Sequence, residues 1–101
     1  MSDYRILCID DDADFLVGMR MQFRGRFEVA TAASIEEGLS ALRGQSVDLV
    51  LLDVELGQES GIGGIGAIKS LDPAIDVAML SGVRDPRVIV EAVRAGAVDY
   101  L

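Results

Sequence analysis

Carboxylates follow two apolar runs of the chain, and these are the residues best suited to chemistry. Asp10 and Asp11 come directly after the run Arg5–Ile9, and Asp53 ends the stretch 47–53. Short runs rich in Val, Leu and Ile are typical of strands buried on both faces of a parallel sheet. Because parallel strands end at one shared edge, where open α/β sheets bind ligands, we expect these three acids to converge.

Converging carboxylates repel one another unless a cation neutralises them. Hard oxygen ligands with room for water suit Mg²⁺, which takes one or two carboxylates together with phosphate oxygens. A competing interpretation is that residues 10–12 only cap the following helix, with Asp12 or Asp14 accepting the amide hydrogens of its first turn. A solvated turn aspartate is the corresponding alternative for Asp53. Because acids follow two different strands, a metal site is favoured over helix capping and over a solvated turn aspartate.

A glycine-rich segment matches the dinucleotide-binding pattern literally, but its context does not fit. Gly61, Gly63 and Gly66 form G-x-G-x-x-G, yet seven residues separate Asp53 from Gly61. The pattern belongs in a tight turn between the first strand and its helix. Here that turn carries the acids 10–12, which would repel a pyrophosphate. Packing or flexibility of a helix is therefore the favoured reason for these glycines.

Three further side chains are weaker candidates. Ser81 comes one residue after the apolar run 76–80, so it could donate a hydrogen bond to a ligand at the same edge or be a solvated turn serine. Tyr100 is most simply a half-buried core aromatic. Cys8, the only cysteine, lies inside an apolar run and is interpreted as a small buried hydrophobe.

Strands and helices are expected to alternate along the chain. Phe15, Leu16, Met19 and Phe23 fall at helical spacing, and Ser34 with Glu37 forms a capping box at the start of a second helix. The expected strands are 5–9, 27–32, 47–53, 76–80 and 97–101, and the expected helices are 14–24, 35–44, 62–72 and 86–96. This alternation predicts an α/β fold with a parallel sheet and right-handed crossovers.

Composition limits the class of protein. The chain has 101 residues, enough for one domain, and half of them are apolar. Its net charge of −8, from 17 acidic and 9 basic residues, disfavours a nucleic-acid surface and fits a domain that binds cations or a basic partner. The absence of histidine excludes His-based zinc sites and His-dependent catalysis. No signal peptide or membrane-length apolar run is present, so the expected location is cytoplasmic.

The ordered set of motifs resembles the receiver domain of bacterial two-component response regulators, over nearly the whole chain. The matching pieces, in order, are Ile9-Asp10-Asp11, Asp53 after Asp48-Leu-Val-Leu-Leu, Gly61, Leu80-Ser81-Gly82, and Ala95-Gly96-Ala97-Val98-Asp99-Tyr100. The resemblance implies one receiver domain over residues 1–101. It also implies a flavodoxin-like doubly wound sheet with strand order 2-1-3-4-5.

The resemblance also assigns roles to individual residues. Asp53 would be the phosphoacceptor, taking a phosphoryl group from a sensor histidine kinase or phosphotransfer protein. Asp10, Asp11, Asp53 and the backbone carbonyl of Glu55 would bind Mg²⁺. The remaining roles fall on two elements: Ser81 would bond a phosphoryl oxygen, Gly82 would leave the approach open, and Tyr100 would be the switch aromatic.

Two departures from the family pattern are present. Gly57 stands where the family usually has proline, which predicts a more mobile loop. The family also places a lysine just after the fifth strand, whereas the only lysine here is Lys69 in the third expected helix. We therefore expect a fragment that is incomplete in or after the fifth strand and lacks the last helix. Such a fragment would phosphorylate poorly alone and could be relieved by homodimerisation or strand exchange.

Other functions remain open at this stage. A degenerate receiver would act only as a phosphorylation-independent interaction or dimerisation module, and the missing lysine favours it. A small Mg²⁺-dependent phosphatase-like enzyme would need a second acid, for which Glu55 is the nearest candidate. The leading expectation is a non-enzymatic phosphoryl acceptor that catalyses its own phosphorylation and dephosphorylation. An output domain is expected in the longer protein, and contact with nucleic acid or membrane is not.

Overall fold

The computed structural model describes residues 4–53, 55–56, 59–80 and 86–100. Its main sheet has five parallel strands in the order β2-β1-β3-β6-β7. Their bounds are β1 Arg5–Ile9, β2 Glu28–Ala32, β3 Leu49–Asp53, β6 Asp76–Leu80 and β7 Asp99–Tyr100. Numbered among these five, the order is 2-1-3-4-5, which confirms the predicted fold.

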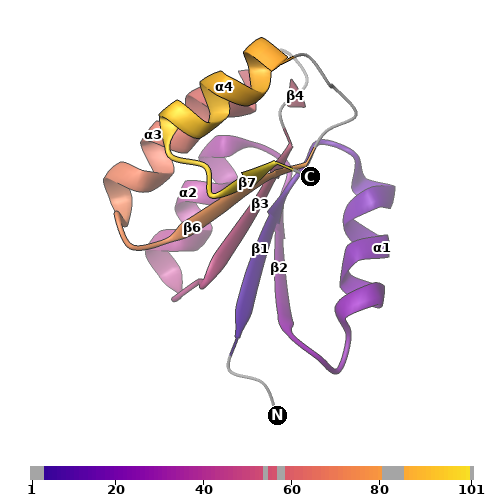
Figure 1. Cartoon of the computed structure of the whole chain (residues 1–101). Helices are drawn as coiled ribbons and strands as arrows, with labels where there is room; N and C mark the ends of the chain where they lie inside the picture. Colours follow the sequence, from indigo (N-terminus) through magenta and orange to yellow (C-terminus); the bar gives the residue numbers. More distant parts are fainter. Residues whose placement is uncertain (1–3, 54, 57–58, 81–85, 101) are drawn as a thin grey trace.

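Four helices cover the sheet (Figure 1). They are α1 Ala13–Phe23, α2 Ile35–Gly44, α3 Gly61–Leu71 and α4 Pro86–Ala95. Helix α1 covers one face, and α2, α3 and α4 cover the other. Each helix links two parallel strands, as a doubly wound sheet requires.

Side-chain alternation along β1 divides the interior into two cores. Leu7 and Ile9 belong to the larger core beneath α2, α3 and α4, and Ile6 and Cys8 belong to the smaller core beneath α1. This follows from the period of two along a strand. Burial raises the pKa of the Cys8 thiol to about 11, and the charge of Asp10 adds to the rise. The interpretation of Cys8 as a buried hydrophobe is therefore confirmed.

Local signals set the helix ends. Asp12 is the N-cap of α1, and its Oδ1 accepts from the amides of Asp14 and Phe15 at 3.0 and 3.2 Å. At α2, Ser34 Oγ accepts from Glu37 N at 3.2 Å. The Glu37 carboxylate reaches back one residue further than in a standard capping box, to Ala33 N at 3.3 Å. The capping prediction is confirmed at Ser34, and of the two acids proposed for α1 the cap is Asp12.

The bounds of three expected strands need correction. Strand β3 begins at Leu49, two residues later than expected. Strand β2 begins at Glu28, one residue later than expected, and the described part of the fifth strand is only Asp99–Tyr100. The other end of that predicted strand, Leu101, lies outside the described residues.

A short antiparallel pair was not anticipated. Strands β4 (Glu55–Leu56) and β5 (Glu59–Ser60) pair with each other between β3 and α3. Two-residue strands leave no periodic pattern, so the sequence carried no signal for them. The predicted mobility of the loop at Gly57 concerns a residue outside the described ranges. In the part of the chain that is described, no helix has the length and apolar character needed to cross a bilayer.

Candidate phosphoryl-acceptor site

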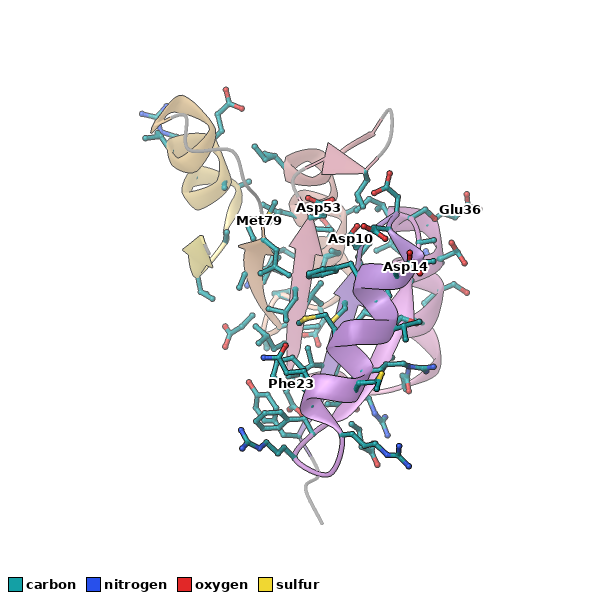
Figure 2. The ribbon with its side chains drawn as sticks, turned by 90° about the vertical axis from the view of Figure 1, so that its right-hand side faces the viewer. Asp10, Asp14, Phe23, Glu36, Asp53 and Met79 are labelled. Carbon is teal, nitrogen blue, oxygen red and sulfur yellow. The ribbon has the colours of Figure 1, made fainter. Side chains whose placement is uncertain are left out.

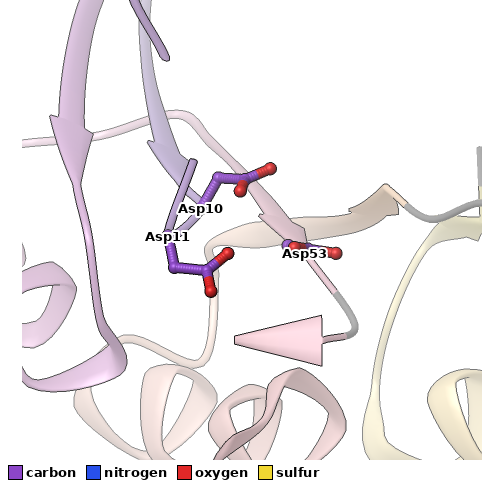
Figure 3. A group of neighbouring side chains, drawn as sticks. All are labelled: Asp10, Asp11 and Asp53. Carbon is purple, nitrogen blue, oxygen red and sulfur yellow. The ribbon is translucent and has the colours of Figure 1, made fainter. Parts of the chain in front are cut away.

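The strand register brings the three predicted acids together. In the parallel pair β1–β3, Ile9 lies opposite Leu52, so Asp10 and Asp53 are the next residues on neighbouring strands. Oxygen atoms of Asp10, Asp11 and Asp53 all lie within 4.8 Å of one another. Figure 3 shows the three carboxylates reaching toward one region from the ends of β1 and β3. The predicted convergence is confirmed.

Backbone hydrogen bonds hold this edge in shape. The amide of Asp10 donates to the carbonyl of Ala32 on β2 at 3.0 Å, which extends the β1–β2 ladder past its last strand residue. Asp10 Oδ1 accepts from the amide of Asp12 at 2.9 Å, which tightens the turn into α1. The three consecutive acids thus divide their roles: Asp12 caps the helix, whereas Asp10 and Asp11 join Asp53.

The electrostatics of the edge favour a bound cation. Burial raises the pKa of Asp10 above its ordinary value of 3.8, and the hydrogen bond from the Asp12 amide opposes this rise. The charges of Asp11 and Asp12 raise it further. Asp10 is half-buried at the carboxyl edge, so its ionised form carries a cost that a positive ion would remove.

The oxygen geometry fits a small divalent cation. Opposite ligands of Mg²⁺ lie about 4.2 Å apart, twice a bond of about 2.1 Å, so oxygens within 4.8 Å need only small side-chain rotations to bind one ion. Asp10 and Asp53 are half-buried and Asp11 is exposed, which leaves an open side for water or phosphate oxygens. The three acids therefore have the spacing and the open side that a hard-cation site requires, as the sequence predicted.

The other predicted site residues are located only in part. Glu55 begins β4, opposite Ser60, and Tyr100 lies in β7 opposite Met79. The side chains of Glu55 and Tyr100 are not described. Ser81 and Gly82 lie outside the described residues, directly after β6. Their roles stay predictions.

The only lysine serves a different part of the fold. Lys69 Nζ donates to the carbonyl of Ile75 at 2.8 Å, which ties the last turn of α3 to the residue just before β6. Ile75 precedes the amino end of that strand, whereas Asp53 ends its own strand at the carboxyl edge. Lys69 therefore does not contribute to the acidic site, as its mismatch with the position of the family's lysine indicated.

Packing explains one glycine of this segment, Gly64, whereas a Cβ on Gly63 or Gly66 would meet nothing within 4 Å. The pattern lies inside α3 and not in a strand–helix turn. A Cβ built on Gly64 would lie 2.2 Å from Ile35 Cδ1, so glycine at this position allows α3 to approach the start of α2. The nucleotide-binding reading is not supported by this placement.

A surface hollow of about 450 Å³ lies at the other edge of the sheet, between the ends of α2 and α3. Its lining includes Arg43, Ser46 and Asp72. The sequence contained no motif for it, and it does not include the three aspartates.

Figure 2 shows Asp10 and Asp53 at one end of the molecule and Phe23, in the last turn of α1, at the other.

The sequence model of the response regulator receiver domain matches residues 6–101. The chain belongs to this family. This conclusion agrees with the sheet order and with the acids at the ends of β1 and β3.

Curated relatives of this receiver domain are transcriptional regulators. The transcriptional regulatory protein ZraR of Escherichia coli K12 is 38% identical over 97 residues, which cover 95% of this chain and 22% of that protein. PrrA of Mycobacterium tuberculosis is 33% identical over 98 residues, 96% of this chain and 42% of that protein. The receiver domain thus spans less than half the length of these relatives.

Solved structures share the fold. A response regulator from Burkholderia pseudomallei, with a phosphorylated aspartic acid, a calcium ion and citrate, has a TM-score of 0.91 and 28% identity. That match covers 98% of this chain and 59% of that one. A CheY-like receiver domain from Methanospirillum hungatei has a TM-score of 0.89 and 30% identity, covering 99% and 81% of the two chains.

Proposed function

We propose that this receiver domain accepts a phosphoryl group on Asp53 in a Mg²⁺-dependent reaction, with a sensor histidine kinase or phosphotransfer protein as the donor. The observation that carries the proposal is the convergence of Asp10, Asp11 and Asp53 at the carboxyl edge. Family membership supports it, because the matched family is the receiver domain of response regulators. The domain transfers the group to itself, and so it is not proposed as an enzyme acting on an external substrate.

The chemistry follows from the arrangement of the acids. An ionised Asp53 oxygen forms a bond to phosphorus while the bond from phosphorus to the donor histidine nitrogen breaks, and the imidazole keeps that electron pair. Asp10 and Asp11, with the Glu55 carbonyl, would hold the cation beside Asp53. When bound, Mg²⁺ neutralises charge on the phosphoryl oxygens, which is the main requirement of such transfers.

The remaining parts of the proposal concern the response. Ser81 would donate a hydrogen bond to a phosphoryl oxygen, and Gly82 would leave room for the donor. Tyr100 would move when Ser81 moves, and this movement would alter an output surface. Because the relatives are longer transcriptional regulators, we propose that an output domain accompanies this one. We also propose that the protein is bacterial and cytoplasmic, because the kinase domain that would donate the phosphoryl group acts in the cytoplasm.

The test is labelling with a small phosphodonor such as phosphoramidate, with and without Mg²⁺. It is done on this chain and on the longer protein that carries it. We expect an acid-stable, base-labile label in the longer protein that requires Mg²⁺ and disappears in Asp53→Asn. Asp14→Asn is the matched control, because Asp14 is an exposed acid of the first turn of α1 that is not among the three converging acids. Labelling of Asp53→Asn at the wild-type level would contradict the proposal, and equal labelling without Mg²⁺ would contradict its metal dependence.

A further inference from the structure

The hollow at the amino edge of the sheet is separate from the three aspartates and has a composition of its own. Helices α2 and α3 lie side by side on one face of the sheet (Figure 1), and both run opposite to the strands, so they end at this edge. The hollow between their ends has a volume of about 450 Å³. Small-molecule sites usually have volumes of about 300–1,000 Å³. The hollow is therefore large enough for a small ligand.

Part of the lining is apolar. Leu42 and Val47 come from the end of α2 and the segment that leads to β3, and Leu71 is the last residue of α3. Val47 is buried and Leu42 is half-buried, whereas Leu71 is 40% exposed. The chain itself thus leaves part of this apolar surface in contact with water. A ligand with an apolar side chain would gain free energy by covering it.

Backbone carbonyls at the end of α2 add negative character. Amides that follow α1, α3 and α4 donate back to carbonyls of those helices. Within the described residues no such bond follows α2, whose C-cap residue, Gln45, is extended with a φ of −158°. Gly44 has no side chain, so it lines the hollow with backbone atoms. The last carbonyls of α2 can therefore accept hydrogen bonds from a ligand, and the helix dipole favours a positive group there.

Two side chains of opposite charge complete the lining, one from the end of each helix. Arg43 lies in the last turn of α2, Asp72 directly follows α3, and both are exposed. Asp72 Oδ1 accepts from the amide of Ala74 at 3.1 Å, which fixes the carboxylate beside the helix end. In the part of the chain that is described, neither Arg43 nor Asp72 forms an ion pair. The hollow thus offers a positive and a negative group that do not neutralise each other.

We propose that this hollow binds a small apolar α-amino acid as its zwitterion. The ammonium group donates to the Asp72 carboxylate and to the free carbonyls of α2, and the ligand carboxylate pairs with the planar guanidinium of Arg43. The apolar side chain covers Leu71 and its apolar neighbours. A simple anion fits poorly because it would meet Asp72 and the carbonyls, and a simple cation would meet Arg43. The site lies at the opposite edge from Asp53 and does not depend on phosphoryl transfer.

The test is titration of the 101-residue chain with L-leucine, followed by ¹⁵N–¹H NMR. The amide of Gly44 lies in the hollow and reports binding, and the amide of Gly18, in α1 on the other face of the sheet, is the internal reference. Three control ligands each lack one feature. N-acetyl-L-leucine has no ammonium group, L-leucinamide has no carboxylate, and glycine has no side chain.

We expect L-leucine to shift Gly44 and to leave Gly18 unchanged. Each control ligand should bind about tenfold more weakly or worse, because each loses one charge-assisted or apolar contact. L-leucine should also raise the melting temperature of the wild type, since it binds only the folded chain.

Variants of the two charged residues assign each half of the ligand. Arg43→Gln should weaken L-leucine about tenfold but leave the weak binding of L-leucinamide unchanged, because that ligand has no carboxylate to lose. Asp72→Asn should weaken L-leucine to a similar extent and leave N-acetyl-L-leucine unchanged. Asparagine keeps an oxygen for the Ala74 amide, so the turn after α3 is preserved. Arg94→Gln is the matched control, an exposed arginine in the last turn of α4, and should bind as the wild type does.

Three outcomes would overturn the proposal. The first is the absence of any Gly44 shift and of any thermal shift with L-leucine up to its solubility limit, in protein whose spectrum shows it folded. The second is equal binding of L-leucine, N-acetyl-L-leucine and L-leucinamide, which would mean that apolar contact alone fills the hollow. The third is wild-type binding by both Arg43→Gln and Asp72→Asn, which would place the ligand elsewhere.

Discussion

Charged side chains have opposite effects on stability at the two edges of the sheet. At the amino edge, the Arg5 side chain pairs with Glu28 and donates to the carbonyl of Ser46, while the Arg5 amide donates to Asp48. At the carboxyl edge, the three carboxylates of Asp10, Asp11 and Asp53 lie together. Charge at the amino edge joins β1 to its neighbours and stabilises the fold. Charge at the carboxyl edge opposes folding until a cation or proton arrives, which is the mark of a functional site.

The first prediction concerns the buried thiol of Cys8, two residues before Asp10 of the carboxyl edge. Burial and the charge of Asp10 hold the pKa of Cys8 at about 11, against 9.0 for an ordinary thiol. Above pH 9 the unfolded chain loses this proton while the folded chain keeps it, so stability is fully present below pH 9 and is lost as the pH rises to about 11. The expected loss is on the order of 2–3 kcal/mol.

Urea unfolding of the wild type and of Cys8→Ala between pH 8 and 11 checks this prediction. Alanine lowers the stability at every pH by leaving a cavity, so the comparison is between the two pH dependences. The wild type should lose stability more steeply. Parallel curves would mean that folding does not raise the pKa of the thiol.

The second prediction tests whether the carboxyl edge is a cation site. Mg²⁺ should raise the melting temperature of the wild type, since it binds only the folded chain. Asp11→Asn should weaken Mg²⁺ affinity about 10- to 100-fold, or roughly 1.4–2.7 kcal/mol. Glu28→Gln, at the amino edge, should leave Mg²⁺ affinity unchanged. Titrations followed by thermal shift give both affinities, and an equal response of the two variants would remove the distinction between the edges.

The third prediction concerns the change in stability when one negative charge of the carboxyl edge is removed and no Mg²⁺ is bound. Asp10→Asn should stabilise the Mg²⁺-free protein, because it removes a charge whose folded pKa is raised, while its oxygen can still accept from the Asp12 amide. Solvent screens this half-buried charge, so the gain should be only about 0.5 kcal/mol. The gain should be complete at neutral pH. It should fade as the pH falls through the raised pKa and vanish below 3.8, where the wild-type carboxyl is protonated in both states. A destabilised variant in urea unfolding at pH 7 would show that the carboxylates do not repel strongly.

The smallest effect is expected at the amino edge, with the opposite sign. Glu28→Gln should destabilise the fold by about 0.5 kcal/mol, since its salt bridge with Arg5 is partly exposed and screened by solvent. The loss should shrink in about 1 M salt, where charges are screened within about 3 Å. Urea unfolding at low and high salt measures it. A gain in stability would contradict the contrast between the two edges.

Sequence patterns predicted those features that depend on neighbours along the chain. Ser34 with Glu37 predicted the start of α2, and the apolar runs before Asp10 and Asp53 predicted buried strands. Both kinds of signal depend only on residues that are close together in the sequence. Local spacing does not decide which side of a helix is buried. The spacing of Phe15 suits the core as well as that of Leu16 does, and only the position of α1 over the sheet decides which of the two is covered.

By itself, the sequence determined the alternation of strands and helices, the placement of acids after two strands, and the family to which the chain belongs. Tertiary structure decided which acids meet. Asp10 and Asp53 are neighbours because Ile9 pairs with Leu52, and Asp12 is excluded because it turns to cap α1. Strand register and helix packing join residues that are far apart in the chain, and a linear pattern does not contain those distances.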